Sequence, residues 1–173
     1  MRRQIHLFNG GLALFLVGGS AWALPQLPAR IPHHFNLVGI ADAYWATTPM
    51  RWMLLPGLAL AVAALLYGVA GWVGRASDSI NVPNQRQYDA LAPAAKRVVC
   101  RDVQVFLYGT ATAMLVLFAA IQASTYHVAT TGADALPMLG WSVSIGMPVG
   151  LLAAALALAW WLPRRVRRLA DED

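Results

Sequence analysis

Four long apolar runs constrain the fold of this chain more than any other feature of its sequence. They cover approximately residues 7–24, 53–73, 103–126 and 139–162, and none contains Asp, Glu, Lys or Arg. A helix needs about 20 apolar residues to cross the hydrocarbon core of a bilayer. Only 12% of the residues are charged, against about 25% in soluble domains. The sequence therefore predicts an all-α fold in which residues 1–173 form a single polytopic membrane domain, a bundle of four transmembrane helices.

The first run has a second interpretation. Its basic start, apolar middle and the sequence Ala21-Trp22-Ala23 resemble a secretory signal peptide with its cleavage site. Because such sites are frequent by chance, we expect the segment to be retained as the first helix.

The basic residues predict which side of the membrane each loop faces. Of the thirteen Lys and Arg residues, only Arg30 and Arg51 lie between the first two runs, and the third loop has none. The others flank the two chain ends or lie within residues 75–102. Because basic segments stay on the cytoplasmic side, both termini and residues 75–102 should be cytoplasmic. Residues 25–48 should then form an irregular outer loop.

Tryptophans stand at both ends of two runs. Trp52 and Trp72 bracket the second run, and Trp141 and Trp160 bracket the fourth. Each pair is about one membrane thickness apart along a helix, and indole rings favour the membrane–water interface. We therefore predict that these residues form aromatic belts.

Glycine spacing predicts close helix packing. Gly68, Gly71 and Gly74 recur three residues apart, and Gly146 and Gly150 have a GxxxG spacing. Small residues let helix backbones approach closely in lipid. Contact within this chain's own bundle is the favoured interpretation, and a homo-oligomer interface is the alternative.

Residues 75–102 end in an amphipathic pattern. From Ala94 onward, valines recur on one helical face, with Lys96 and Arg97 opposite. The third helix should therefore begin before the bilayer and lie partly in the interface, where basic residues attract anionic lipid headgroups. A protein-docking surface is the alternative.

Prolines predict where helices end, begin and bend. Pro25 cannot continue the first helix, which should end near Leu24. Thr48 followed by Pro49 is typical of a helix N-cap and first helical residue. Pro56 should kink the second helix, which neighbouring helices tolerate.

The outer loop of residues 25–48 is rich in prolines and in residues that form turns. Its prolines predict extended chain, and Gly39 permits a turn at positive φ. Asp42 is a candidate N-cap for a short interfacial helix containing Tyr44 and Trp45.

Polar side chains that could bind a metal or take part in chemistry gather on the predicted outer face. Histidine nitrogens and carboxylates bind zinc or copper, so His33, His34, Asp42 and His127 are the candidate metal ligands. Adjacent histidines diverge from an extended chain, however, so their spacing is not diagnostic. The alternative is structural, because Asn36 and Asp42 can bond nearby amides and build the turn around Gly39.

The stretch LPARIPHHFNLVGIADAYW resembles the hallmark of a small amino-terminal membrane domain in SdpI-type bacterial immunity and signalling proteins. The family pattern runs proline, isoleucine-proline, His-Phe-Asn, a glycine, and an aspartate followed by an aromatic residue. The matching positions are Pro28, Ile31, Pro32, His34, Phe35, Asn36, Gly39, Asp42 and Trp45. The resemblance is strong from Leu24 to Pro49 and weak in the flanking helices.

This resemblance implies a multi-pass protein of the bacterial inner (plasma) membrane. It also implies an outer loop that binds a ligand or partner, through His34, Phe35, Asn36, Gly39, Asp42 and Trp45. Family members often carry a lysine shortly after the aromatic residue, where this chain has Ala46, and they have further helices. The resemblance therefore supports the domain rather than the immunity activity.

The sequence favours a binding or signalling protein over an enzyme. Walker, GxGxxG, HExxH and CxxC motifs are absent, and no cofactor is indicated. The expected partners are the lipid bilayer and a peptide or another membrane subunit, not nucleic acid. A structural subunit of a larger membrane complex is the alternative, and a metal-dependent enzyme of the outer face ranks last.

Overall fold

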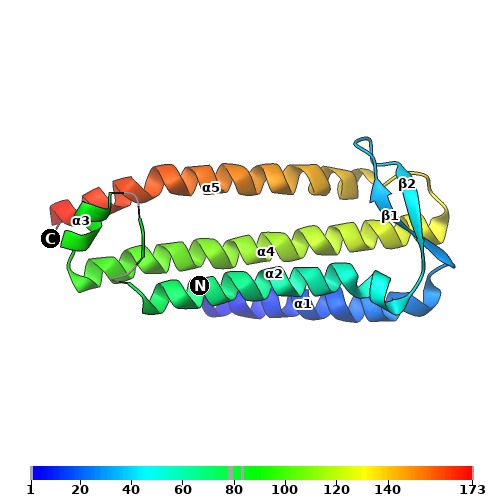
Figure 1. Cartoon of the computed structure of the whole chain (residues 1–173), viewed down its shortest axis with the longest axis horizontal. Coiled ribbons are helices and arrows are strands. Elements are labelled where there is room, and N and C mark those ends of the chain that lie inside the picture. The colour runs from blue at the N-terminus through cyan, green and yellow to red at the C-terminus, as the bar shows by residue number, and fades with distance from the viewer. Residues whose placement is uncertain (1, 78–79, 83, 173) are drawn as a thin grey trace.

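The computed structural model describes residues 2–77, 80–82 and 84–172. Four long helices run alongside one another in it (Figure 1). They are α1 (Arg2–Ala23), α2 (Pro49–Arg75), α4 (Pro93–Thr131) and α5 (Met138–Glu172). Within the described chain, these four helices are long and apolar enough to cross a membrane. The predicted fold class, an all-α bundle with four helices of transmembrane length, is confirmed.

Four short elements complete the fold. A 3-10 turn, η1 (Leu24–Gln26), follows α1, and the strands β1 (Arg30–Phe35) and β2 (Ala41–Ala46) form a hairpin before α2. The short helix α3 (Gln85–Ala90) precedes α4. The hairpin lies at one end of the bundle, called here the cap end (Figure 1). The carboxyl end and α3 lie at the other end, called the basic end.

The helix ends follow the signals in the sequence. α1 ends at Ala23, immediately before the proline-containing turn. The Thr48 hydroxyl accepts a hydrogen bond from the Arg51 amide at 3.2 Å, and Pro49 is the first helical residue of α2. α4 begins at Pro93, well before its apolar run. The predicted end of the first helix, cap of the second and early start of the third are confirmed.

The central helix of the bundle is α4. It packs against α1, α2 and α5, and α1 also packs against α2. The main contacts of α5 are with α4 and α3, and no residue of its most apolar stretch is buried. The helices α1, α2 and α4 therefore pack around one another along the bundle, and α5 joins the core near its carboxyl end through Leu162, Val166 and Leu169. Within the described chain, the apolar face of the spanning stretch of α5 stays uncovered.

Hydrogen bonds tie the three core helices together at the cap end. Pro56 lacks the amide hydrogen that would normally donate to the Trp52 carbonyl four residues earlier. The buried Gln122 side chain of α4 donates to this carbonyl instead, at 3.2 Å. The Trp52 indole in turn donates to the Ser20 carbonyl of α1 at 2.8 Å. A neighbouring helix thus supplies the donor that proline removes, as membrane helices require.

A second buried amide joins α2 and α4 towards the basic end. Gln104 donates to the Ala70 carbonyl at 2.8 Å, and its side chain lies where a Cβ on Gly74 would collide with it. Gly146 and Gly150, in contrast, have open space where a Cβ would be. Packing within the chain therefore explains Gly74, whereas Gly146 and Gly150 leave the homo-oligomer alternative open.

The structure corrects one part of the predicted aromatic belts. Trp52 is only 2% exposed, because it packs against α1, α4 and the hairpin rather than facing the membrane. Trp72 and Trp160 are 51% and 63% exposed, and Trp141 is 39% exposed. These three residues retain the accessibility that a membrane-interface tryptophan needs.

We predict that Trp52→Phe lowers the thermal stability of the purified protein more than Trp72→Phe does. Both changes keep an aromatic ring, but only the first removes a buried hydrogen bond, worth about 1 kcal/mol. The midpoint of thermal unfolding in detergent measures the difference. Equal shifts for the two variants would contradict the structural role assigned to the Trp52 indole.

Candidate functional site

Much of the predicted irregular outer loop forms a β-hairpin. The two strands are antiparallel, with Ile31 opposite Trp45 and Pro32 opposite Tyr44, and the register shifts around His34. The short interfacial helix expected after Asp42 is therefore wrong, since these residues lie in β2. The conformation of residues 41–46 is set by pairing with β1, and an aspartate that favours a helix N-cap carries no information about that pairing.

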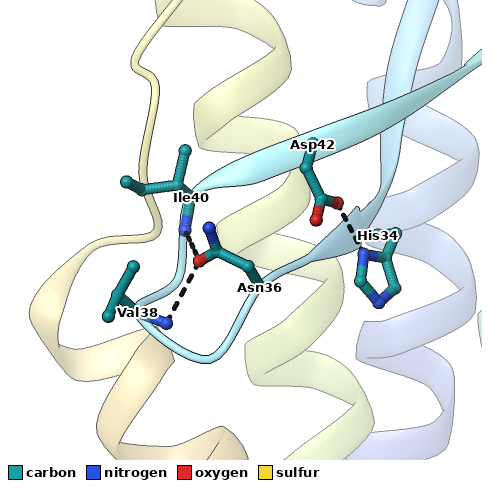
Figure 2. A network of polar contacts seen from close by, with 5 residues as sticks. All are labelled: His34, Asn36, Val38, Ile40 and Asp42. Carbon is teal, nitrogen blue, oxygen red and sulfur yellow. Dashed lines mark hydrogen bonds and ion pairs between the residues drawn. The ribbon is translucent and has the colours of Figure 1, made fainter.

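The tip of the hairpin is held by the Asn36 side chain. Its carbonyl oxygen accepts hydrogen bonds from the Val38 amide at 3.1 Å and the Ile40 amide at 3.0 Å (Figure 2). The Gly39 amide donates to the Asn36 main-chain carbonyl at 2.8 Å, and Gly39 has a φ of 81°. The predicted turn at Gly39, with an asparagine bonding nearby amides, is confirmed.

His34 and Asp42 face each other across the two strands. The His34 Nδ1 and Asp42 Oδ1 atoms are 2.5 Å apart (Figure 2). The side chains are 64% and 44% exposed. An exposed pair of this kind contributes about 1 kcal/mol or less to stability. Both groups therefore remain accessible to a partner from outside the protein.

The third loop completes the cap by pairing with the hairpin. The Asp134 carbonyl accepts a hydrogen bond from the Ala41 amide at 2.9 Å, and the Leu136 amide donates to the Gly39 carbonyl at 2.8 Å. Figure 1 shows this loop, between α4 and α5, lying beside the strands. The cap therefore consists of residues 30–46 and 132–137, which are far apart in sequence.

Trp141 of α5 fixes the hairpin tip from the side. Its indole nitrogen donates to the Leu37 carbonyl at 3.0 Å. A Cβ added to Gly39 would lie 2.8 Å from the Trp141 ring, so only glycine fits there. The side chains of Leu37 and Val38 are nonetheless 90% and 68% exposed. The tip is thus an exposed apolar surface on a fixed backbone.

A cavity of about 180 Å³ lies between the hairpin and the helices α2 and α4. Trp45 and Arg51 belong to its lining, together with His33 and Phe35 from β1. The His33 and Trp45 rings stack with centroids 4.0 Å apart, and the Arg51 guanidinium lies 5.8 Å from the Trp45 ring centroid. Arg51 also donates to the Ala46 carbonyl at 3.0 Å. The cavity therefore combines apolar and aromatic walls with one cationic group.

The candidate metal ligands are not brought together as a set. His34 meets Asp42, but His33 stacks on Trp45. His127 is an exposed residue of α4. Among the residues that the structure describes, no three His, Cys, Asp or Glu side chains gather in a geometry suited to a metal ion. Of the four predicted ligands, His34 and Asp42 are the two whose side chains contact each other.

A polar cluster between α1, α2 and α4, with the buried Asn9 at its centre, was not predicted from the sequence. Asn9 of α1 donates to the Tyr67 hydroxyl of α2 at 3.1 Å and accepts from the Thr112 hydroxyl of α4 at 2.7 Å. His6 lies 3.1 Å from the Tyr67 hydroxyl and contacts the Tyr108 ring edge-on. Three of the four long helices contribute one or two residues each, and only the relative register of these helices reveals that the residues meet.

The four apolar helices make this chain a multi-pass membrane protein. A family described as a domain of unknown function, DUF1648, matches residues 11–60. No curated protein and no solved structure gives a significant match. The chain is therefore similar to DUF1648 over the segment that runs from α1 through the hairpin into α2.

We predict that Gly39→Ala loosens the cap more than Gly132→Ala does. Both glycines have positive φ, at 81° and 70°, but only Gly39 lies against Trp141. Alanine in the left-handed region costs about 1–2 kcal/mol at either position. The collision with Trp141 adds to this cost at Gly39. Faster amide hydrogen exchange at residues 36–41 in Gly39→Ala alone is the expected result, and unchanged exchange there would contradict the model of the tip.

Proposed function

We propose that this protein binds an extended peptide, or a peptide segment of another protein, at its cap. The observation that carries the proposal is the cavity between the hairpin and α2, with its aromatic walls and Arg51. Its volume of about 180 Å³ is below the roughly 300–1,000 Å³ of small-molecule sites. It therefore suits a single apolar side chain of a larger partner rather than a whole cofactor.

The cap also supplies the polar groups that orient a peptide. A guanidinium has five N–H donors, and Arg51 uses one of them in its hydrogen bond to the Ala46 carbonyl. A carboxylate of the partner would meet the remaining donors beside Trp45. His34 and Asp42, which are exposed next to the cavity-lining residues of β1, add a second polar contact. The exposed Leu37 and Val38 extend the apolar contact along the tip.

We extend the proposal to a biological role of the kind found in the SdpI-type proteins, whose small membrane domain the outer motif resembles. In this proposal the chain lies in the bacterial inner membrane with both termini cytoplasmic, and the cap faces outward. It serves there in peptide immunity or in signalling. Support comes from the His-Phe-Asn motif and from the uneven distribution of basic residues. The DUF1648 match over residues 11–60 includes the motif.

A second role, as a subunit of a larger membrane complex, is favoured by α5. Its apolar stretch is unburied, and Gly146 and Gly150 offer open space for a neighbouring helix. In that case purification in mild detergent would yield a stable heteromeric complex, and the cap would be an assembly contact.

A selection from random peptides tests the binding role. The full chain in lipid nanodiscs is exposed to phage that display peptides of about a dozen residues, with empty nanodiscs as the reference. We expect enriched peptides with an apolar residue near an acidic one. Arg51→Ala should lower their affinity about tenfold or more, because a hydrogen bond to a charged group is worth about 1.5–3 kcal/mol.

Arg164→Ala is the matched control, since Arg164 also stacks on a tryptophan but lies near the basic end. It should leave the affinity unchanged. The proposal fails if no peptide is enriched over empty nanodiscs, or if the enriched peptides bind the Arg51→Ala variant as tightly as the wild type.

A further inference from the structure

Two neighbouring cavities lie at the basic end of the bundle, away from the cap. The first, of about 400 Å³, is lined by Arg2 of α1 and by Arg97 and Arg101 of α4. The second, of about 540 Å³, shares Arg2 and Arg101 and adds Asp102 and Trp161. Both volumes fall within the range of ligand sites. Three guanidinium groups from two helices therefore surround one region of accessible space.

Within the described chain, the arginines that line the first cavity have no acidic side chain as a partner. Among the described residues, neither Arg97 nor Arg101 forms an ion pair, and no Asp or Glu lines the first cavity. Arg2 donates to the neutral Gln104 side chain. Asp102 lines the second cavity, but it faces Arg165 at 3.5 Å. Within the described chain, the arginines thus present donors without a protein anion to receive them.

The tryptophans beside the cavities indicate that these lie at the level of the lipid headgroups. Trp161 lines the second cavity, and the neighbouring Trp160 is 63% exposed on the same end of α5. Exposed tryptophans mark the membrane–water interface. Val105, also in the lining, continues into the apolar run of α4. The first cavity with the neighbouring second cavity therefore runs from a basic surface into apolar surface, which matches the headgroup and the first part of an acyl chain.

We propose that the cavity lined by Arg2, Arg97 and Arg101 binds the phosphate group of an anionic phospholipid. Guanidinium groups bind phosphate through paired, charge-assisted hydrogen bonds. Basic pockets between membrane helices are suited to anionic headgroups. The bound phosphate bridges α1 and α4, so it stabilises the bundle at the end opposite the cap. This site is independent of the peptide-binding role.

Thermal unfolding of the full chain in neutral detergent tests this site. Phosphatidylglycerol should raise the unfolding midpoint by a few degrees more than phosphatidylcholine does, because a ligand that binds only the folded state stabilises it. Native mass spectrometry should show phosphatidylglycerol retained on the protein. The double variant Arg97→Gln/Arg101→Gln should lose both effects. The control Arg167→Gln/Arg168→Gln removes the same charge from exposed residues outside the cavities and should keep both.

A third variant, Arg97→Lys/Arg101→Lys, keeps the charge and removes the guanidinium forks. It should fold and retain part of the effect. If inorganic phosphate alone reproduces the stabilisation and the Gln variant abolishes it, the phosphate site is supported with a soluble ligand as its source. The proposal is overturned if the two lipids stabilise equally, or if the cavity and control variants lose the response alike.

Discussion

The hydrogen bond from Gln122 to the Trp52 carbonyl is the interaction on which the cap end depends. Apolar surface gives helices no preference for one another over lipid, so packing and polar links decide how they associate. Pro56 leaves a carbonyl of α2 without its helical donor, and Gln122 of α4 supplies one. Trp52 then reaches α1 through Ser20 and packs beneath Ile31 of the hairpin. Through these contacts, Trp52 links α1, α2 and α4 to one another and forms the base of the cap.

The cap is built on this support from two separate loops. Asn36 shapes the tip, and Trp141 holds it against α5. The exposed groups, above all Leu37, are therefore presented by a backbone that is fixed from two sides. A binding surface of this kind loses little conformational entropy when a partner arrives. In our proposal, an anionic phospholipid bound in the basic cavity at the opposite end stabilises the same bundle without sharing residues with the cap.

The sequence predicted the helices well because their signals are local. Apolar length locates the four helices, Pro25 marks the end of α1, and Thr48 with Pro49 marks the start of α2. The turn at Gly39 was predictable for the same reason, because the signal for it lies in the glycine itself. The strand at Asp42 and the burial of Trp52 were not predictable in this way, since both depend on contacts with distant parts of the chain. The cluster around Asn9 was not predictable for the same reason, because it depends on the relative register of α1, α2 and α4.

A double-mutant cycle between Gln122→Leu and Pro56→Ala tests the central claim most directly. The stability of each variant is measured by thermal unfolding of the purified chain in detergent. Alanine at position 56 restores the amide donor to α2, so Gln122 should become dispensable in that background. We predict that Gln122→Leu costs about 1 kcal/mol in the wild type and little in Pro56→Ala. An equal cost in both backgrounds would contradict the role assigned to Gln122.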